Sequence, residues 1–216
     1  MSLLREYIRE LLTEAAMGPA DLPNDVYVRV ENRDKYLRVF YSYKDGEQIG
    51  TGMGNEIVSG YVEAKSPDAR EKGRATPDRE SCLGAWMVIG AGATHGWGPL
   101  LYDVAMEVVG GAGLMADRQS LSKAAFNVWN VYMSRGDVVK KQLDDTENTL
   151  TPGEEDNCDI DTAIHHSGLK VADVFNSDWS DEDGTDLLLG SPVMKVYTKG
   201  PTTIEKLKAM GRFIGE

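Results

Sequence analysis

The length, composition and charge of the chain limit what it can be. Its 216 residues are 41% hydrophobic, enough for one ordinary domain with a buried core plus short appended segments. Its 35 acidic residues outnumber its 23 Lys and Arg residues, and the resulting net charge of -12 would repel a phosphate backbone, so we expect no nucleic-acid partner. The 2 cysteines cannot build a disulfide framework, and no apolar run approaches the roughly 20 residues of a membrane span. We therefore expect a reducing compartment and no membrane partner.

The N-terminus is expected to form a short amphipathic helix. Apolar residues stand at positions 4, 7, 8 and 11, on one helical face, and charged residues fill the other face. Gly and Pro residues then interrupt the chain between positions 17 and 24. These patterns predict a helix within residues 1–14, a linker over 15–24 and a folded domain over 25–216.

The first part of that domain is expected to be β-structure. Residues 26–30, 36–43 and 57–62 are rich in β-branched and aromatic residues, and Lys44-Asp45-Gly46 is a turn signal, so an antiparallel meander is predicted. Residues 83–89 are apolar nearly throughout, which predicts a strand that is buried on both faces.

Helices and strands are expected to alternate in the second half. Pro99 suits the first turn of a helix that runs to Val109, and a second helix should follow Ser120 or Ser122 as N-cap and end near Arg135. Strands are expected near 113–115 and over 193–197. Residues 202–205 match a capping box, which predicts a closing helix that contains residues 207, 210 and 214. Two acidic stretches, 144–161 and 178–186, are expected to be solvated loops rather than ion sites.

The most distinctive local pattern is a glycine-rich turn between an apolar strand and a helix, Gly96-Trp97-Gly98-Pro99. Such a turn can hold a diphosphate, because glycines let the backbone come close and the first amides of the helix point outward. The alternative is that these glycines only allow a tight turn. A P-loop is disfavoured because the Lys-Ser/Thr ending is absent, and a dinucleotide-binding fold is disfavoured because the first strands do not alternate with helices.

Residues 27–135 resemble the GNAT superfamily of acetyl-CoA-dependent N-acetyltransferases, in which the turn reads Gln/Arg-x-x-Gly-x-Gly/Ala. The aligned residues are Ala93-Thr94-His95-Gly96-Trp97-Gly98, so the glycines match and Ala93 departs from the family's Gln or Arg. The resemblance implies an α/β (α+β) fold with a mostly antiparallel central sheet flanked by helices, and acetyl-CoA as cofactor. The coenzyme-binding residues that it implies are Val88, Ile89, His95, Gly96, Trp97, Gly98, Leu100 and Ser122.

The same resemblance implies direct attack of an amine on the thioester, so the protein must accept a proton and support the leaving thiolate. The family often uses a tyrosine of the second helix as the general acid, and Tyr132 stands near that place. The alternative for Tyr132 is a core position. Glu63 and Glu80 lie near strand ends and are the candidates for the base. The acidity of the chain favours a basic acceptor such as a lysine or a polyamine.

The N-terminal segment resembles the capsid-targeting peptides of internal head proteins of tailed phages. Those peptides combine a short helix that has a Glu-aromatic-Ile core with a cleavage site of the form Leu/Ile-x-Glu before a small residue. Here Glu6-Tyr7-Ile8 and Leu12-Thr13-Glu14 before Ala15 fit both parts. The resemblance implies cleavage between Glu14 and Ala15, scaffold or capsid proteins as partners, and a location in the host cytoplasm or the capsid interior. The alternative is an ordinary helix that docks on its own domain.

The sequence therefore supports two alternative functions, an N-acetyltransferase and a non-catalytic virion protein that keeps the fold. A metal site is not expected, because the spacing of Cys158, His165 and His166 matches no zinc pattern. A catalytic Cys158 is also disfavoured, since the surrounding carboxylates raise a thiol pKa.

Overall fold

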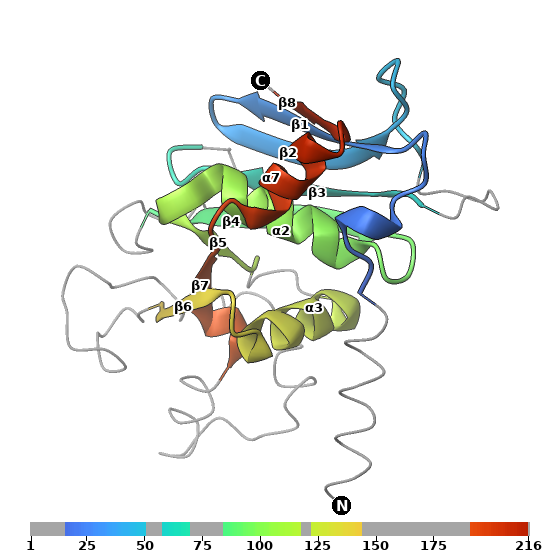
Figure 1. Cartoon of the computed structure of the whole chain (residues 1–216). Coiled ribbons are helices and arrows are strands. Elements are labelled where there is room, and N and C mark those ends of the chain that lie inside the picture. Colours follow the sequence, from blue (N-terminus) through green and yellow to red (C-terminus); the bar gives the residue numbers. More distant parts are fainter. Residues whose placement is uncertain (1–15, 51–57, 70–83, 118–121, 144–190, 216) are drawn as a thin grey trace, which may run out of the picture. The chain divides into compact units, whose positions relative to one another are not determined.

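The structure is a computed structural model that describes residues 16–50, 58–69, 84–117, 122–143 and 191–215 (Figure 1). The chain divides into two compact units. The first unit takes residues 1–63, 90–108 and 200–216, and the second takes residues 64–89 and 109–199. The expected N-terminal helix and both acidic stretches lie outside the described residues.

The described residues form strands, α-helices and short 3-10 helices. The strands are β1 (Tyr27–Arg33), β2 (Tyr36–Ser42), β3 (Gly60–Lys65), β4 (Trp86–Ala93), β5 (Leu114–Met115), β6 (Val139–Gln142), β7 (Lys195–Thr198) and β8 (Phe213–Gly215). The α-helices are α2 (Gly98–Val109), α3 (Lys123–Ser134) and α7 (Thr202–Ala209), and the 3-10 helices are η1 (Pro19–Asp21), η2 (Gly110–Ala112) and η4 (Pro192–Met194).

The strands join in one eight-stranded sheet in the order β6-β7-β5-β4-β3-β2-β1-β8. β1 pairs antiparallel with β2 and parallel with β8, whereas β5 pairs parallel with β4 and antiparallel with β7. The protein is therefore a mixed α/β structure, as the sequence predicts at that level, and its sheet is mixed.

The first unit is built on the β1–β2 hairpin, with α2 and α7 on one side of it (Figure 1). The register places Val28 opposite Tyr41 and Val30 opposite Val39. All four side chains are buried, whereas Arg29 and Arg38 on the alternate positions are only half-buried. This alternation follows from the two-residue period of a strand, so the apolar face of the hairpin forms the core of the unit.

The predicted closing helix is too long and its predicted capping box is wrong. α7 ends at Ala209, and Gly211 with φ 67° allows a Schellman ending, in which the amide of Arg212 donates to Leu207 O at 2.8 Å. The chain then forms β8, in which Ile214 pairs beside Arg29 of β1. The helix ends here because the positive φ of Gly211 is incompatible with a right-handed α-helix.

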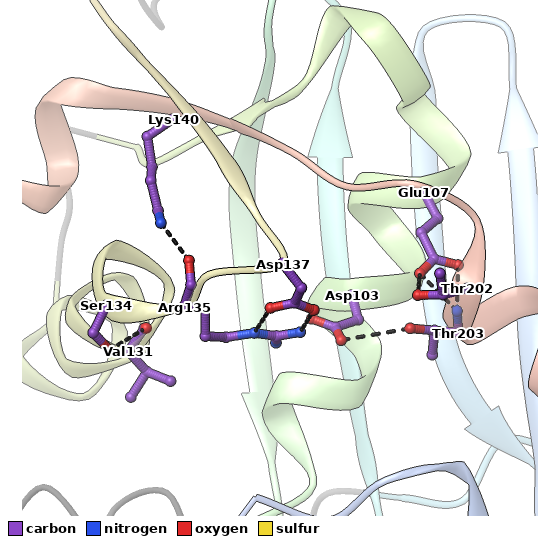
Figure 2. A network of polar contacts seen from close by, with 9 residues as sticks. All are labelled: Asp103, Glu107, Val131, Ser134, Arg135, Asp137, Lys140, Thr202 and Thr203. Carbon is purple, nitrogen blue, oxygen red and sulfur yellow. Dashed lines mark hydrogen bonds and ion pairs between the residues drawn. The ribbon is translucent and has the colours of Figure 1, made fainter.

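The N-terminus of α7 is capped by another helix rather than by its own residues. The Glu107 carboxylate of α2 accepts hydrogen bonds from the amides of Thr203 at 2.8 Å and Ile204 at 2.7 Å (Figure 2). Thr202 Oγ1 donates to Glu107 as well, at 3.5 Å. The N-cap residue, Pro201, makes no side-chain capping hydrogen bond. A buried carboxylate that is distant in sequence therefore satisfies the orphan amides.

The second unit contains β5, β6, β7 and α3. The predicted helix after Ser122 is confirmed, and the Ser122 hydroxyl accepts the Ala125 amide at 3.1 Å. The predicted strand over 193–197 is only partly right, because residues 193 and 194 belong to η4 and the strand begins at Lys195. Three aromatic rings pack in this unit: Trp129 stacks on Tyr197 at 5.1 Å, and Tyr132 lies 6.3 Å from Tyr197.

The apolar strand predicted over 83–89 is displaced toward the turn. β4 runs from Trp86 to Ala93, so the strand continues past Ile89 almost to the glycine-rich turn. Met87 and Val88 are buried, whereas Ala91 and Ala93 are exposed. Within the predicted stretch, burial on both faces holds for the neighbouring residues Met87 and Val88 and not for Trp86 and Ile89, which are half-buried.

Candidate functional site

The glycine-rich segment forms a four-residue turn, Thr94–Trp97, within the first unit. The Trp97 amide donates to Thr94 O at 3.0 Å, and Gly96, the third residue, has φ 83°. A type II turn requires a positive φ at that position, which favours glycine. Helix α2 begins at the next residue, Gly98. The predicted strand, glycine turn and helix are thus present in the predicted order.

Two neighbouring segments hold the turn in place. The Thr94 amide donates to Ser59 O at 2.9 Å, the Ser59 amide donates to Thr94 Oγ1 at 3.0 Å, and the two hydroxyls lie 2.8 Å apart. On the other side, the Met17 amide donates to Gly96 O at 2.9 Å. Because backbone groups are fixed from both sides, the turn is preorganised.

A buried aromatic pair fixes the end of the turn. The Tyr41 hydroxyl donates to Trp97 O at 2.7 Å, and the two rings meet edge to face at 5.9 Å. Both side chains are buried, and burial raises the pKa of Tyr41 above its ordinary value. Tyr41 therefore acts as a neutral donor, and the Trp97 side chain belongs to the core rather than to an open site.

Gly98 differs from Gly96 in what the fold demands of it. Its φ is not positive, and a Cβ placed on it would lie 3.8 Å from Ala93 Cβ, which is an ordinary contact. Neither the backbone nor the packing of the described residues requires glycine there. Gly98 adds no side chain to the first turn of α2. The first amides of any α-helix lack intrahelical acceptors.

The other expected coenzyme residues fall in both units. His95 is exposed, and the Leu100 side chain is buried in the first turn of α2, so only the main chain of Leu100 can face a ligand. Val88, Ile89 and Ser122 belong to the second unit, in which Ser122 caps α3. Glu80, Glu14 and Ala15 lie outside the described residues.

A polar cluster lies beside the second half of β4 and was not predicted as a group. Arg38 Nε lies 3.1 Å from Glu63 Oε1, and the Arg38 guanidinium stands over the Tyr61 ring at 5.9 Å. A Cβ on Gly90 would lie 3.5 Å from Glu63 Oε2, and one on Gly92 would lie 3.5 Å from the Tyr61 ring. Both are ordinary contact distances, so Gly90 and Gly92 lie directly against the side chains of Glu63 and Tyr61. The alternation of polar residues along β2 and β3 was the signal that could have grouped them.

Tyr132, the expected general acid, is fully buried in the second unit. The Arg135 guanidinium lies over its ring at 5.0 Å, and Arg135 also pairs with Asp137 at 2.6 Å (Figure 2). The hydrogen bond from Arg135 lowers the pKa of Asp137. The Trp129 ring at 6.2 Å and the Tyr197 ring at 6.3 Å complete a packed aromatic cluster around Tyr132.

In comparisons with known proteins, no family model, curated protein or solved structure matches the chain. Within the described ranges, no group of three or more His, Cys, Asp or Glu residues is arranged to hold a metal ion. None of the helices in that part of the chain has the length and apolar character of a bilayer span.

Proposed function

We propose that the chain binds acetyl-CoA at the turn Thr94–Trp97 and the start of α2, and transfers the acetyl group to an amine. The observation that carries this proposal is Gly98, a glycine that the described structure does not need for folding. A side chain at this position would project where a diphosphate must approach the helix amides, so a ligand explains its absence.

The order of the elements supports the GNAT-like assignment. The hairpin β1–β2 is followed by β3, β4, the glycine turn, α2, β5 and α3, which is the succession that the sequence resemblance implies. β4 and β5 pair in parallel, with Trp86 beside Leu114 and Met87 beside Met115. A parallel pair requires a crossover connection, and α2 supplies it. This succession is the reason to prefer an acetyltransferase to another diphosphate-binding protein.

The proposed roles follow from the placement of each group. The amides at the start of α2 hold the diphosphate, because no Lys or Arg stands between residues 93 and 100. The bound coenzyme supplies the activated acetyl group. Glu63 accepts the proton of the amine, since its carboxylate is half-exposed and Arg38 holds it beside Gly90 of β4.

Thermal unfolding of the full chain with and without acetyl-CoA tests the proposal. At about 100 times its Kd, a ligand specific for the native state adds about 2.7 kcal/mol to the free energy of unfolding. We expect this gain for the wild type and its loss in Gly98→Glu, because the new carboxylate repels the diphosphate.

The matched control is Gly200→Ala. Gly200 lies in the same unit, and a Cβ placed on it would meet nothing within 4 Å. This variant should retain the full response to acetyl-CoA. An equal response in wild type and Gly98→Glu would show that the turn is not the coenzyme site, and no response in the wild type would refute coenzyme binding.

A second candidate is a non-catalytic protein of a phage head that keeps this fold. The observation that favours it is the complete burial of Tyr132 among Trp129 and Tyr197, which leaves the expected general acid inside the core. The same unfolding measurement separates the two candidates, since a structural role requires no stabilisation by acetyl-CoA.

A further inference from the structure

An open cavity of about 660 Å³ lies in the first unit, away from the glycine-rich turn in sequence. Its lining comes from the segment that enters β1 and from the turn that leaves β2. The lining residues are Asn24, Asp25, Tyr27, Tyr43, Lys44 and Asp45. The antiparallel hairpin brings these two segments together, because Tyr27 pairs with Ser42. The volume is that of a site for a small organic ligand.

One aromatic ring of the cavity already carries a cation. The guanidinium of Arg212 lies 5.5 Å from the centroid of the Tyr27 ring. Arg212 is held there by hydrogen bonds that it donates to Pro23 O at 2.7 Å, Val26 O at 3.1 Å and Asn24 Oδ1 at 3.0 Å. This face of the Tyr27 ring is thus filled by Arg212 from within the protein, so it is not available to a ligand.

The second ring of the cavity is the one offered to a ligand. Tyr43 is half-buried, and its position is fixed because its amide donates to Glu47 O at 2.9 Å and its carbonyl accepts the Gly46 amide at 3.1 Å. Within the described ranges, no Lys or Arg stacks on the Tyr43 ring.

The charges of the lining point to the same class of ligand. Asp25 and Asp45 are exposed carboxylates, and Lys44 is the single basic residue among the six that line the cavity. The Asp45 carboxylate accepts the Glu47 amide at 3.1 Å through one oxygen, which orients the side chain. Two carboxylates beside a tyrosine ring attract an ammonium group both by charge and by the ring's negative face.

We propose that this cavity binds an alkyl ammonium ligand, a linear polyamine being the chemical class that fits it. One ammonium group lies over the Tyr43 ring and further ammonium groups pair with Asp25 and Asp45. The net charge of -12 adds long-range attraction for such a ligand. This inference does not rest on the coenzyme proposal, because it uses none of the residues of the glycine-rich turn.

Isothermal titration calorimetry of the full chain with spermidine, in the absence of coenzyme, tests this inference. We expect one saturable site per chain. Tyr43→Ala should weaken binding about fivefold through the loss of a cation–π contact. The double variant Asp25→Asn and Asp45→Asn should weaken it about tenfold, while each Asn keeps an oxygen acceptor.

Two control variants separate a specific site from diffuse attraction. Tyr36→Ala removes an exposed tyrosine from the opposite end of β2, and Asp34→Asn with Glu205→Gln removes the same net charge at exposed positions. Both controls should bind spermidine as the wild type does. Equal weakening in the two double variants, or the absence of a saturable site in the wild type, would overturn the inference.

Discussion

At the scale of single residues, the two glycines of the turn have different reasons to be glycine. Gly96 has φ 83°, a conformation that a residue with a Cβ adopts only at a cost, whereas Gly98 has no such conformation and room for a Cβ. The first glycine is explained by the fold, whereas the fold does not explain the second, which the proposed coenzyme site would explain.

This difference predicts opposite effects of the same substitution. Gly96→Ala should lower the free energy of unfolding by about 1–2 kcal/mol, because alanine is strained at positive φ. Gly98→Ala should leave the free energy unchanged or raise it by up to about 1 kcal/mol, because alanine restricts the unfolded chain. Urea unfolding of the two variants beside the wild type measures both values.

A loss in Gly98→Ala as large as that in Gly96→Ala would mean that the fold itself requires Gly98. The main support for the coenzyme proposal would then be lost. Gly200→Ala again provides the reference for an alanine placed where nothing crowds it.

The sequence could predict the turn but not its surroundings. The glycine spacing and Pro99 identify the strand, turn and helix because these signals act within a few residues. The contact of Arg38 with Glu63, and that of Tyr41 with Trp97, join residues from different strands or turns. No local pattern encodes such contacts, since they depend on the register of the sheet.

At the level of helices and strands, one helix cap could be predicted from the sequence and the other could not. Ser122 caps α3 through the amide of Ala125, three residues away, and the sequence predicts this cap. The amides at the start of α7 are satisfied by Glu107, which stands 96 residues from Thr203. Residues Thr202 and Glu205 match a local capping box, yet tertiary structure supplies the cap.

Substitution of Glu107 and, separately, of Glu205 distinguishes the tertiary cap of α7 from a local capping box. Glu107→Ala should lower the free energy of unfolding by about 1–3 kcal/mol, because the buried amides of Thr203 and Ile204 lose their acceptor. Glu205→Ala removes an exposed carboxylate and should change the free energy by no more than about 0.5 kcal/mol. Chemical denaturation gives both values.

Hydrogen exchange adds a local measure of the same contact. The amides of Thr203 and Ile204 should lose protection in Glu107→Ala and keep it in Glu205→Ala. Protection that is lost in Glu205→Ala alone would show that the local capping box forms in solution, contrary to the structure.

At the scale of the whole molecule, the two compact units are not separate segments of the chain. β3 begins in the first unit and ends in the second, and β4 begins in the second and ends in the first. The sequence did not predict this division, because composition shows no linker within either strand. Strands that are shared in this way should make the two units unfold together, since neither keeps its strands intact alone.

Tyrosine ionisation can test that cooperativity, because each unit holds buried tyrosines. Burial raises the pKa of Tyr41 and Tyr102 in the first unit and of Tyr197 in the second. These phenols stay protonated in the native state, whereas in the unfolded chain they ionise near pH 10, at about the ordinary tyrosine pKa. The stability they confer is therefore complete below about pH 10 and falls as the pH rises above it.

In an alkaline titration followed by tyrosinate absorbance, we expect one late step that coincides with the loss of helical circular dichroism. Tyr102→Phe and Tyr197→Phe should each remove a part of that same step. Two late steps, with Tyr197→Phe affecting one and Tyr102→Phe the other, would show that the units unfold independently.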